Sequence, residues 1–181
     1  GATGVVYRPI TFMVDGETGV NANNVLYTVI PSSNREGKEA FLHELRGIDA
    51  VESVGRSVVR PLYDMSSNRI ETPVFATYDK KMVEIEVSLR KMEVGHGFAE
   101  VFELEFVAGG AWPAIQSPEQ AESSVLLNES AATRIGWGSP NEAIGKRLRY
   151  AGRDVTVLGV LRDFHFESLH NRILPFVIEF N

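Results

Sequence analysis

The stretch Val155-Thr-Val-Leu-Gly-Val-Leu-Arg-Asp-Phe-His-Phe-Glu-Ser-Leu-His170 joins an apolar run to a dense group of polar and aromatic side chains. Its first half is rich in valine and leucine, which predicts a buried strand over Arg153 to Arg162. Its second half places an acid, two histidines, a glutamate and a serine within the eight residues 163–170. These residue types occur in catalytic and metal sites, but they also occur at structural corners.

Length and composition describe a folded, acidic, cysteine-free protein. The chain has 181 residues, of which 44% are hydrophobic and 23% charged, so it can bury a sizeable core in one domain or two small lobes. The net charge of −6 and the lack of long basic runs disfavour nucleic-acid binding. The absence of cysteine excludes thiol catalysis and disulfides. Because no apolar run reaches about 18 residues, we expect this polypeptide neither to cross a membrane nor to begin with a secretory signal.

Toward the N-terminus, the pattern predicts a strand, a helix and a second strand. Residues 1–23 are rich in turn formers and are expected to form a loose arm. Val25 to Ile30 is a β-branched and aromatic run, typical of a strand. Arg35 to Arg46 has an apolar face and a charged face, which predicts a helix that ends at Gly47, and Val51 to Val59 is again extended.

The middle of the chain continues with extended runs. Val74 to Tyr78 and Met82 to Val94 are predicted strands, and the second alternates apolar and polar residues, as a strand with one buried face does. Phe98 to Phe106 carries apolar residues at helical spacing. The dipeptide Gly109-Gly110 then interrupts the pattern.

The last third carries the clearest local signals. Val125 to Leu127 is a short predicted strand, and Asn128 is a good N-cap for a helix over Glu129 to Ile135. Ala151-Gly152 predicts a tight hairpin turn between the strands 145–150 and 153–162. A final strand is expected over residues 176–180.

The histidines of the stretch 163–170 favour a structural role. His165 and His170 are five residues apart, which does not place them on one helix face as a zinc pair would be. Ser168 with Asp163 and a histidine has the composition of a catalytic triad, but no Gly-x-Ser-x-Gly motif supports it. Phe164 and Phe166 alternate with polar residues, which is typical of a strand end whose aromatic side chains enter the core.

Three segments together resemble one known family. They are Asn128 to Trp137 (NESAATRIGW), Ile144 to Leu148 (IGKRL) and Val155 to His170, and they are similar to the soluble core of ABC-transporter permeases of the MacB-like or FtsX-like type. Val94 to Gly109 is similar to the segment that leads into the family's "aGR.f" motif, in which Gly110 of this chain takes the place of the arginine. The resemblance covers residues 24–181 and concerns the fold.

The resemblance implies an α+β fold with two lobes, of the kind called Porter-like and Sabre-like subdomains. After the arm of residues 1–23, residues 24–108 and 164–181 would form the main α/β lobe, which holds the strand-helix-strand unit. Residues 109–163 would form an inserted, smaller β-rich lobe. The residues expected to carry the structural motifs are Gly109, Asn128, Gly145, Gly159, Asp163, Phe164, Phe166 and Leu169.

The resemblance also implies a function without catalysis or cofactor. The domain would stand on the extracytoplasmic (periplasmic) face of the inner membrane and transmit ATP-driven motion to a substrate or partner outside. ATP hydrolysis would reside in a separate nucleotide-binding subunit or domain. The implied partners are the transmembrane helices of the permease, the ATP-binding subunit indirectly, a second permease copy, and an extracytoplasmic protein or exported substrate.

A second hypothesis remains beside it. The same stretch could belong to a small stand-alone hydrolase or metal enzyme that uses His165, Glu167 and His170.

Overall fold

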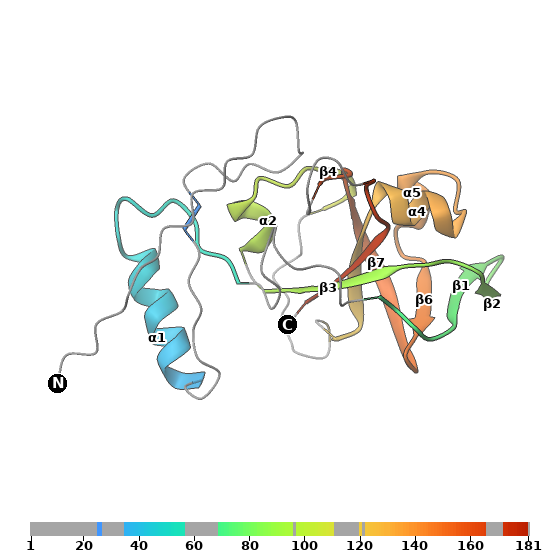
Figure 1. Cartoon of the computed structure of the whole chain (residues 1–181), viewed down its shortest axis with the longest axis horizontal. Helices are drawn as coiled ribbons and strands as arrows, with labels where there is room; N and C mark the ends of the chain where they lie inside the picture. Colours follow the sequence, from blue (N-terminus) through green and yellow to red (C-terminus); the bar gives the residue numbers. More distant parts are fainter. Residues whose placement is uncertain are drawn as a thin grey trace.

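The strands form one mixed sheet in the described part of the chain (Figure 1). The structure is a computed structural model that describes residues 25–26, 35–56, 69–95, 97–110, 120, 122–165 and 172–180. Seven of the eight strands in these residues run in the order β2-β1-β6-β7-β5-β8-β3. The eighth, β4, pairs with β7. The strands are β1 (Val74–Tyr78), β2 (Lys81–Ile85), β3 (Arg90–Val94), β4 (Phe106–Gly109), β5 (Ser124–Asn128), β6 (Arg147–Tyr150), β7 (Arg153–Leu161) and β8 (Phe176–Phe180).

The helices in this part of the chain are few and short. They are α1 (Arg35–Arg46), α2 (Phe98–Val101), α4 (Glu129–Ile135) and α5 (Pro140–Ala143). Together with the mixed sheet, they confirm the expected mixture of α and β structure. None of the helices in the described residues is long and apolar enough to span a membrane.

Strand β7 is the centre of the sheet. It pairs parallel with β5, and antiparallel with β6 along its first half and with β4 along its last. Gly159 stands where β4, β5 and β7 meet, and a Cβ there would lie 3.0 Å from the ring of Phe106 and 3.1 Å from Leu126. Glycine therefore allows these strands to pack without displacing either side chain.

The sheet buries an apolar cluster on each of its two faces. Neighbouring residues of β5 divide between the clusters, Val125 and Leu127 entering one and Leu126 the other, as the pleat of a strand requires. Helix α4 adds alanines and Ile135 to the first cluster, and α2 adds Phe98 to the second. Strands β5 and β8 are therefore covered on both faces, and all their residues but Phe180 are buried.

Several local expectations are confirmed and three are corrected. The helix over Arg35–Arg46, the strand over Val74–Tyr78, the hairpin turn at Ala151-Gly152 and the strands at residues 125–127 and 176–180 are observed. The run 82–94 is not one strand: residues 86–89 separate β2 from β3. The helix predicted over 98–106 stops after Val101, since Glu103 has a φ of 50° and β4 follows.

The third correction concerns the strand-helix-strand unit. Residues 51–56, the described part of its second strand, are not in a strand, although the carbonyl of Arg56 accepts a hydrogen bond from Gly95 N at 2.8 Å. Most of its first strand and the arm of residues 1–23 lie outside the described residues. Strands from both predicted lobes pair in the same sheet, as β5 does with β8, and the lobe boundaries at 109 and 163 remain a prediction.

Candidate functional site

The described part of the motif 163–170 lies against the first turn of α4. Both carboxylate oxygens of Asp163 accept hydrogen bonds from Ser130, from its backbone N at 2.9 Å and from its hydroxyl at 2.5 Å. In return, the backbone N of Asp163 donates to the carboxylate of Glu129 at 2.9 Å. The bond to Ser130 N satisfies one of the amide groups that a helix N-terminus leaves without partners, and Asp163 places a negative charge at the positive end of the helix.

Asn128 joins the same helix to the beginning of β8. Its side chain is fully buried, and its Oδ1 accepts hydrogen bonds from Ala131 N at 3.1 Å and from Phe176 N at 2.8 Å. Its Nδ2 donates to the carbonyl of Leu174 at 2.8 Å. The predicted N-cap of α4 is therefore observed, and the same side chain also fixes the chain that enters β8.

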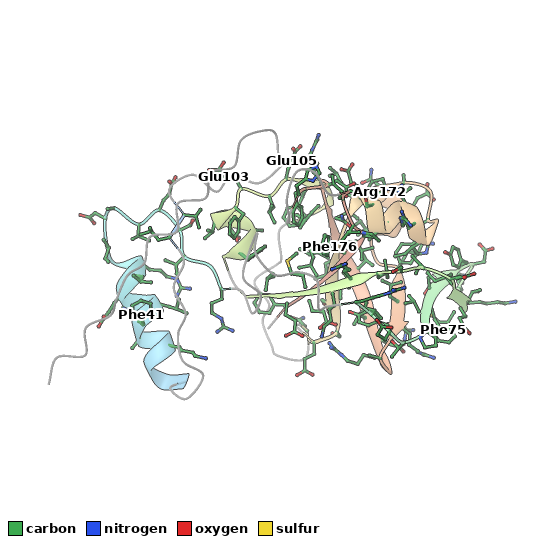
Figure 2. The ribbon with its side chains drawn as sticks, in the orientation of Figure 1. Phe41, Phe75, Glu103, Glu105, Arg172 and Phe176 are labelled. Carbon is green, nitrogen blue, oxygen red and sulfur yellow. The ribbon has the colours of Figure 1, made fainter. Side chains whose placement is uncertain are left out.

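Two aromatic rings close this region from the apolar side. Phe164 is 1% exposed, and its ring stacks on Phe176 with centroids 6.4 Å apart and planes at 8°. Figure 2 shows Phe176 in the crowded centre of the molecule, whereas Phe75 lies toward its β1–β2 end. We call Asn128, Ser130, Asp163, Phe164 and Phe176 the β5–α4 junction.

A second polar cluster surrounds a buried carboxylate on β8. Glu179 is 5% exposed and accepts a hydrogen bond from the Tyr150 hydroxyl at 2.7 Å. Lys91 and Arg153 each approach the carboxylate to 3.3 Å, so its charge is compensated. The cluster links β3, β6, β7 and β8 at the ends of their ladders.

The charges in this cluster alter two pKa values. Burial, together with the charge and hydrogen bond of Glu179, raises the pKa of the Tyr150 hydroxyl, so Tyr150 stays a neutral donor. Burial alone would lower the pKa of Lys91, but its hydrogen bond to Glu93 and the charges of Glu179 and Glu93 raise it. Lys91 therefore remains a cation, and the cluster is a structural ion pair.

The glycines singled out from the sequence differ in how strictly they are required. Gly109 has a φ of 71°, and a Cβ there would lie 2.3 Å from the carbonyl oxygen of Leu158. Gly145 also has a positive φ, of 76°, but has open space where a side chain would be. Gly109 is thus fixed by both conformation and crowding, whereas Gly145 is fixed by conformation alone.

Of the three residues of the enzyme hypothesis, the structure describes His165. His165 is half-buried, and Asp163 is engaged by Ser130. Among the described residues, no group of three or more His, Cys, Asp or Glu side chains is placed to hold a metal ion. The remaining predicted residues of the motif, namely Phe166, Glu167, Ser168, Leu169 and His170, lie outside the described residues.

Sequence reasoning missed the partners that make these sites. Ser130 carries no local signal, because its bond to Asp163 joins positions far apart in the chain. Glu179 offers one signal, a lone acid inside the apolar run FVIEF, which indicates a buried and paired charge. In the β5–α4 junction, the side chains of Asn128 and Asp163 hydrogen-bond to backbone groups of other segments. Such bonds are typical of a structural corner.

A comparison with protein-family models gives a match over most of the chain. The family model described as "MacB-like periplasmic core domain" matches residues 10–176. A search of curated proteins gave no match.

Two of the solved structures that this chain resembles share low sequence identity with it. The first is the extracellular domain of the noncanonic ABC-type transporter YknZ from Gram-positive bacteria, with 20% identity and a TM-score of 0.45, covering 78% of this chain and 60% of that one. The second is the periplasmic region of MacB from Actinobacillus actinomycetemcomitans, with 18% identity and a TM-score of 0.39, covering 65% of this chain and 49% of that one. The chain thus spans only about half to three fifths of the lengths of these two structures.

Proposed function

The chain belongs to the MacB-like periplasmic core domain family, whose model matches residues 10–176, and from this premise we propose that it is the extracytoplasmic domain of an ABC transporter permease. In this proposal, transmembrane helices of the permease hold the domain at the outer face of the cytoplasmic membrane. The domain makes and breaks no covalent bonds. ATP hydrolysis belongs to a separate nucleotide-binding subunit or domain.

Within that setting, we propose that the domain relays ATP-driven motion to an exported substrate or a partner protein outside the membrane. A relay must move as a unit, because a soft part would absorb the displacement. The observation that supports this role is the Asn128 side chain, whose three hydrogen bonds tie α4, the segment at Leu174 and the start of β8 together. A second permease copy would complete the moving assembly.

The location is tested by labelling a single cysteine in the full-length gene product. Because this chain has no cysteine, Thr133→Cys on the exposed face of α4 introduces a unique thiol in it. Any cysteine elsewhere in the product is first replaced. In intact cells with a permeable outer layer, we expect a membrane-impermeant maleimide to label this thiol as fully as after lysis.

The control for labelling is Ala131→Cys, which places the thiol on the buried face of the same helix. That thiol should react only after denaturation, which shows that the domain is folded during the assay. Labelling of Thr133→Cys that appears only after lysis would contradict the proposed location.

The relay is tested separately from the location. Spin labels on Thr133→Cys in a permease assembly should report a distance distribution that changes when ATP binds. Asn128→Ala should reduce that change while the ATP hydrolysis rate persists, since it loosens the domain and leaves the ATP site intact. A matched control is Glu105→Ala, which removes an exposed ion pair with Arg162. An Asn128→Ala response equal to that of the control would contradict the relay.

A further inference from the structure

Helix α4 is attached at both ends, and its second attachment is to the hairpin formed by β1 and β2, here called the β1–β2 hairpin. The hydroxyl of Tyr78 donates a hydrogen bond to the carbonyl of Ile135, the last residue of the helix. The indole Nε1 of Trp137 donates to the carbonyl of Thr77 at 2.9 Å. The helix therefore bonds to the start of β8 through Asn128 at one end and to β1 at the other.

The dipeptide Gly136-Trp137 allows this second attachment to form. Gly136 ends α4 with a φ of 87°, a left-handed conformation that glycine adopts without strain, so the chain turns directly after Ile135. The turn brings Trp137, which is 4% exposed, into the apolar cluster on the α4 face of the sheet. The last carbonyls of a helix have no partner within it, and Tyr78 supplies one. Burial raises the pKa of the Tyr78 hydroxyl, which therefore stays protonated and can donate.

The carbonyl of Thr77 is available to Trp137 because the ladder between β1 and β6 is short. Tyr78 and Lys81 flank the two-residue turn of the hairpin and form its first hydrogen-bonded pair. Since such pairs alternate along an antiparallel ladder, the carbonyl of Thr77 points away from β2. The ladder to β6 pairs residues 75 and 76 of β1, so this carbonyl lies just beyond it.

The two attachments of α4 are on strands that do not pair with each other. In the strand order, β7 and β6 stand between β5, where the helix begins, and β1. The three spacings from β5 to β1, of about 4.8 Å each, add up to about 14 Å. The seven residues of the helix cover about 10 Å, and the capping residues at its ends supply the rest. Helix α4 thus crosses the strands and connects the centre of the sheet to the hairpin.

We propose that α4 is a latch, which holds the β1–β2 hairpin to the centre of the sheet through the bonds of Tyr78 and Trp137. The ladder to β6 gives the hairpin a short attachment, and the latch adds a second one. The latch is held at its other end by the cap at Asn128, so the two ends are coupled. Because coupling between two sites is reciprocal, loosening the junction should free the hairpin, and loosening the hairpin should reach the junction. The latch is a property of the folded chain and rests on neither the proposed location nor the relay.

The effect of the junction on the hairpin attachment is measured by tryptophan quenching. The chain has two tryptophans, so Trp112→Phe leaves Trp137 as the single fluorophore. Trp137 is buried, and acrylamide should quench it little. In this background, we expect Asn128→Ala to raise the quenching constant about threefold, because the indole becomes accessible when the latch opens.

Met92→Ala is the matched control for quenching. Met92 is fully buried on β3, at the other end of the strand order and in the other apolar cluster, and its truncation should cost a similar amount of stability. It should leave the quenching constant of Trp137 unchanged. If Asn128→Ala does not fold, the milder Asn128→Asp takes its place and should still exceed the control.

The effect of the hairpin on the junction is measured by amide hydrogen exchange. Tyr78→Phe removes the hydroxyl and keeps the ring. We expect the amides of Ala131 and Phe176, which bond to Asn128, to exchange about fivefold faster, the factor that one net hydrogen bond contributes. The control is Thr77→Val, which removes a hydroxyl of the same strand that bonds to β6 rather than to α4 and should leave these amides unchanged.

Each measurement has an outcome that overturns the latch. Equal quenching of Trp137 in Asn128→Ala and Met92→Ala would mean that the indole responds to overall stability alone. Junction amides that exchange no faster in Tyr78→Phe than in Thr77→Val would mean that the effect stays at the hairpin. Neither measurement bears on membrane location, so failure of the latch leaves the proposed function standing.

Discussion

The β5–α4 junction and the β1–β2 hairpin show two ways in which this chain uses polar residues. At the junction, Asn128 is fully buried and its hydrogen bonds reach positions 174 and 176, far along the chain. In the hairpin, the charged side chains are exposed, and Asp79 and Lys80 adopt positive φ angles of 46° and 65° to make the turn. The junction therefore fixes distant segments to each other through one buried side chain. The turn of the hairpin is set by its own backbone geometry, while β1 is joined to the rest of the sheet through β6.

This difference predicts that the junction contributes more to the stability of the fold than the hairpin does. A buried polar group must be paired, because leaving it unpaired costs its full desolvation energy, so the junction resists opening. An edge strand keeps groups ready for another chain, and changes there alter the free energy of unfolding little. Substitutions in the two regions should therefore differ in how much stability they remove.

The largest effect is expected at the aromatic side of the junction. Phe164→Ala removes a ring that is 1% exposed and stacked on Phe176, and it should lower the free energy of unfolding by about 3–5 kcal/mol. Urea unfolding of the isolated chain measures the loss. Val83→Ala at the hairpin is the matched control and should change stability by less than about 0.5 kcal/mol. Equal urea midpoints for Phe164→Ala and Val83→Ala would contradict the expected difference in stability between the junction and the hairpin.

The polar side of the junction should be next in size. Asn128→Ala leaves Ala131 N, Phe176 N and the Leu174 carbonyl without their partner, and we expect a loss of about 2–4 kcal/mol. Asn128→Asp loses the donor to Leu174 and buries a charge, but it keeps the acceptor for both N–H groups and the N-terminus of α4 stabilises the carboxylate. It should therefore be less destabilising than alanine at neutral pH. An aspartate variant as unstable as the alanine variant would show that the cap and the link to β8 contribute little.

What the sequence predicted follows the same division between local and distant interactions. The cap at Asn128, the turn at Ala151-Gly152 and the helix over Arg35–Arg46 depend on neighbouring residues, and each is observed. The pairing of Asp163 with Ser130 and of Glu179 with Lys91 depends on which segments the sheet brings together. Such long-range pairs cannot be predicted from the local patterns of one sequence. The sequence therefore identified Asp163 as part of a polar motif but did not identify Ser130 as its partner.

Two misplaced boundaries have physical causes of the same kind. Residues 83–90 alternate apolar and polar side chains without a break, but β2 pairs with β1 and β3 pairs with β8, so the run divides between the two ends of the sheet. The apolar spacing of residues 98–106 suits a helix, yet Phe102 and Leu104 enter the core beneath the sheet after α2 has ended. In both cases tertiary packing overrides a local pattern.

A glycine substitution in the hairpin turn should raise the free energy of unfolding, whereas the substitutions in the junction lower it. Lys80 has a φ of 65°, a conformation that glycine adopts without strain, so Lys80→Gly should raise the free energy of unfolding by about 0.5–1 kcal/mol. Thr133→Gly in the middle of α4 is a suitable contrast, because glycine there should destabilise by about 0.3 kcal/mol. A loss of stability in Lys80→Gly would show that the turn is held by contacts of the lysine side chain.

The smallest effect is expected at the exposed turn between β6 and β7, and it depends on pH. Hydrogen bonding to Arg149, supported by the nearby Arg147, lowers the pKa of Asp154 below its usual value. A carboxylate with a lowered folded pKa stabilises the protein above its unfolded pKa of about 4, and this contribution is lost as the pH falls through the folded value. We expect Asp154→Asn to be slightly less stable than the unmodified chain at pH 7.

The difference between these two proteins should shrink as the pH falls below the unfolded value and vanish once it is below the lowered pKa of Asp154, because the unmodified carboxyl is then protonated as well. Urea midpoints from pH 7 to pH 2.5, with and without added salt, measure it, and salt should shrink it because both partners are exposed. A difference that grows toward acid would contradict the expected sign of the pH dependence. A difference at pH 7 as large as that of Asn128→Ala would mean that an exposed hairpin pair contributes as much as the buried junction, and the contrast between the two regions would fail.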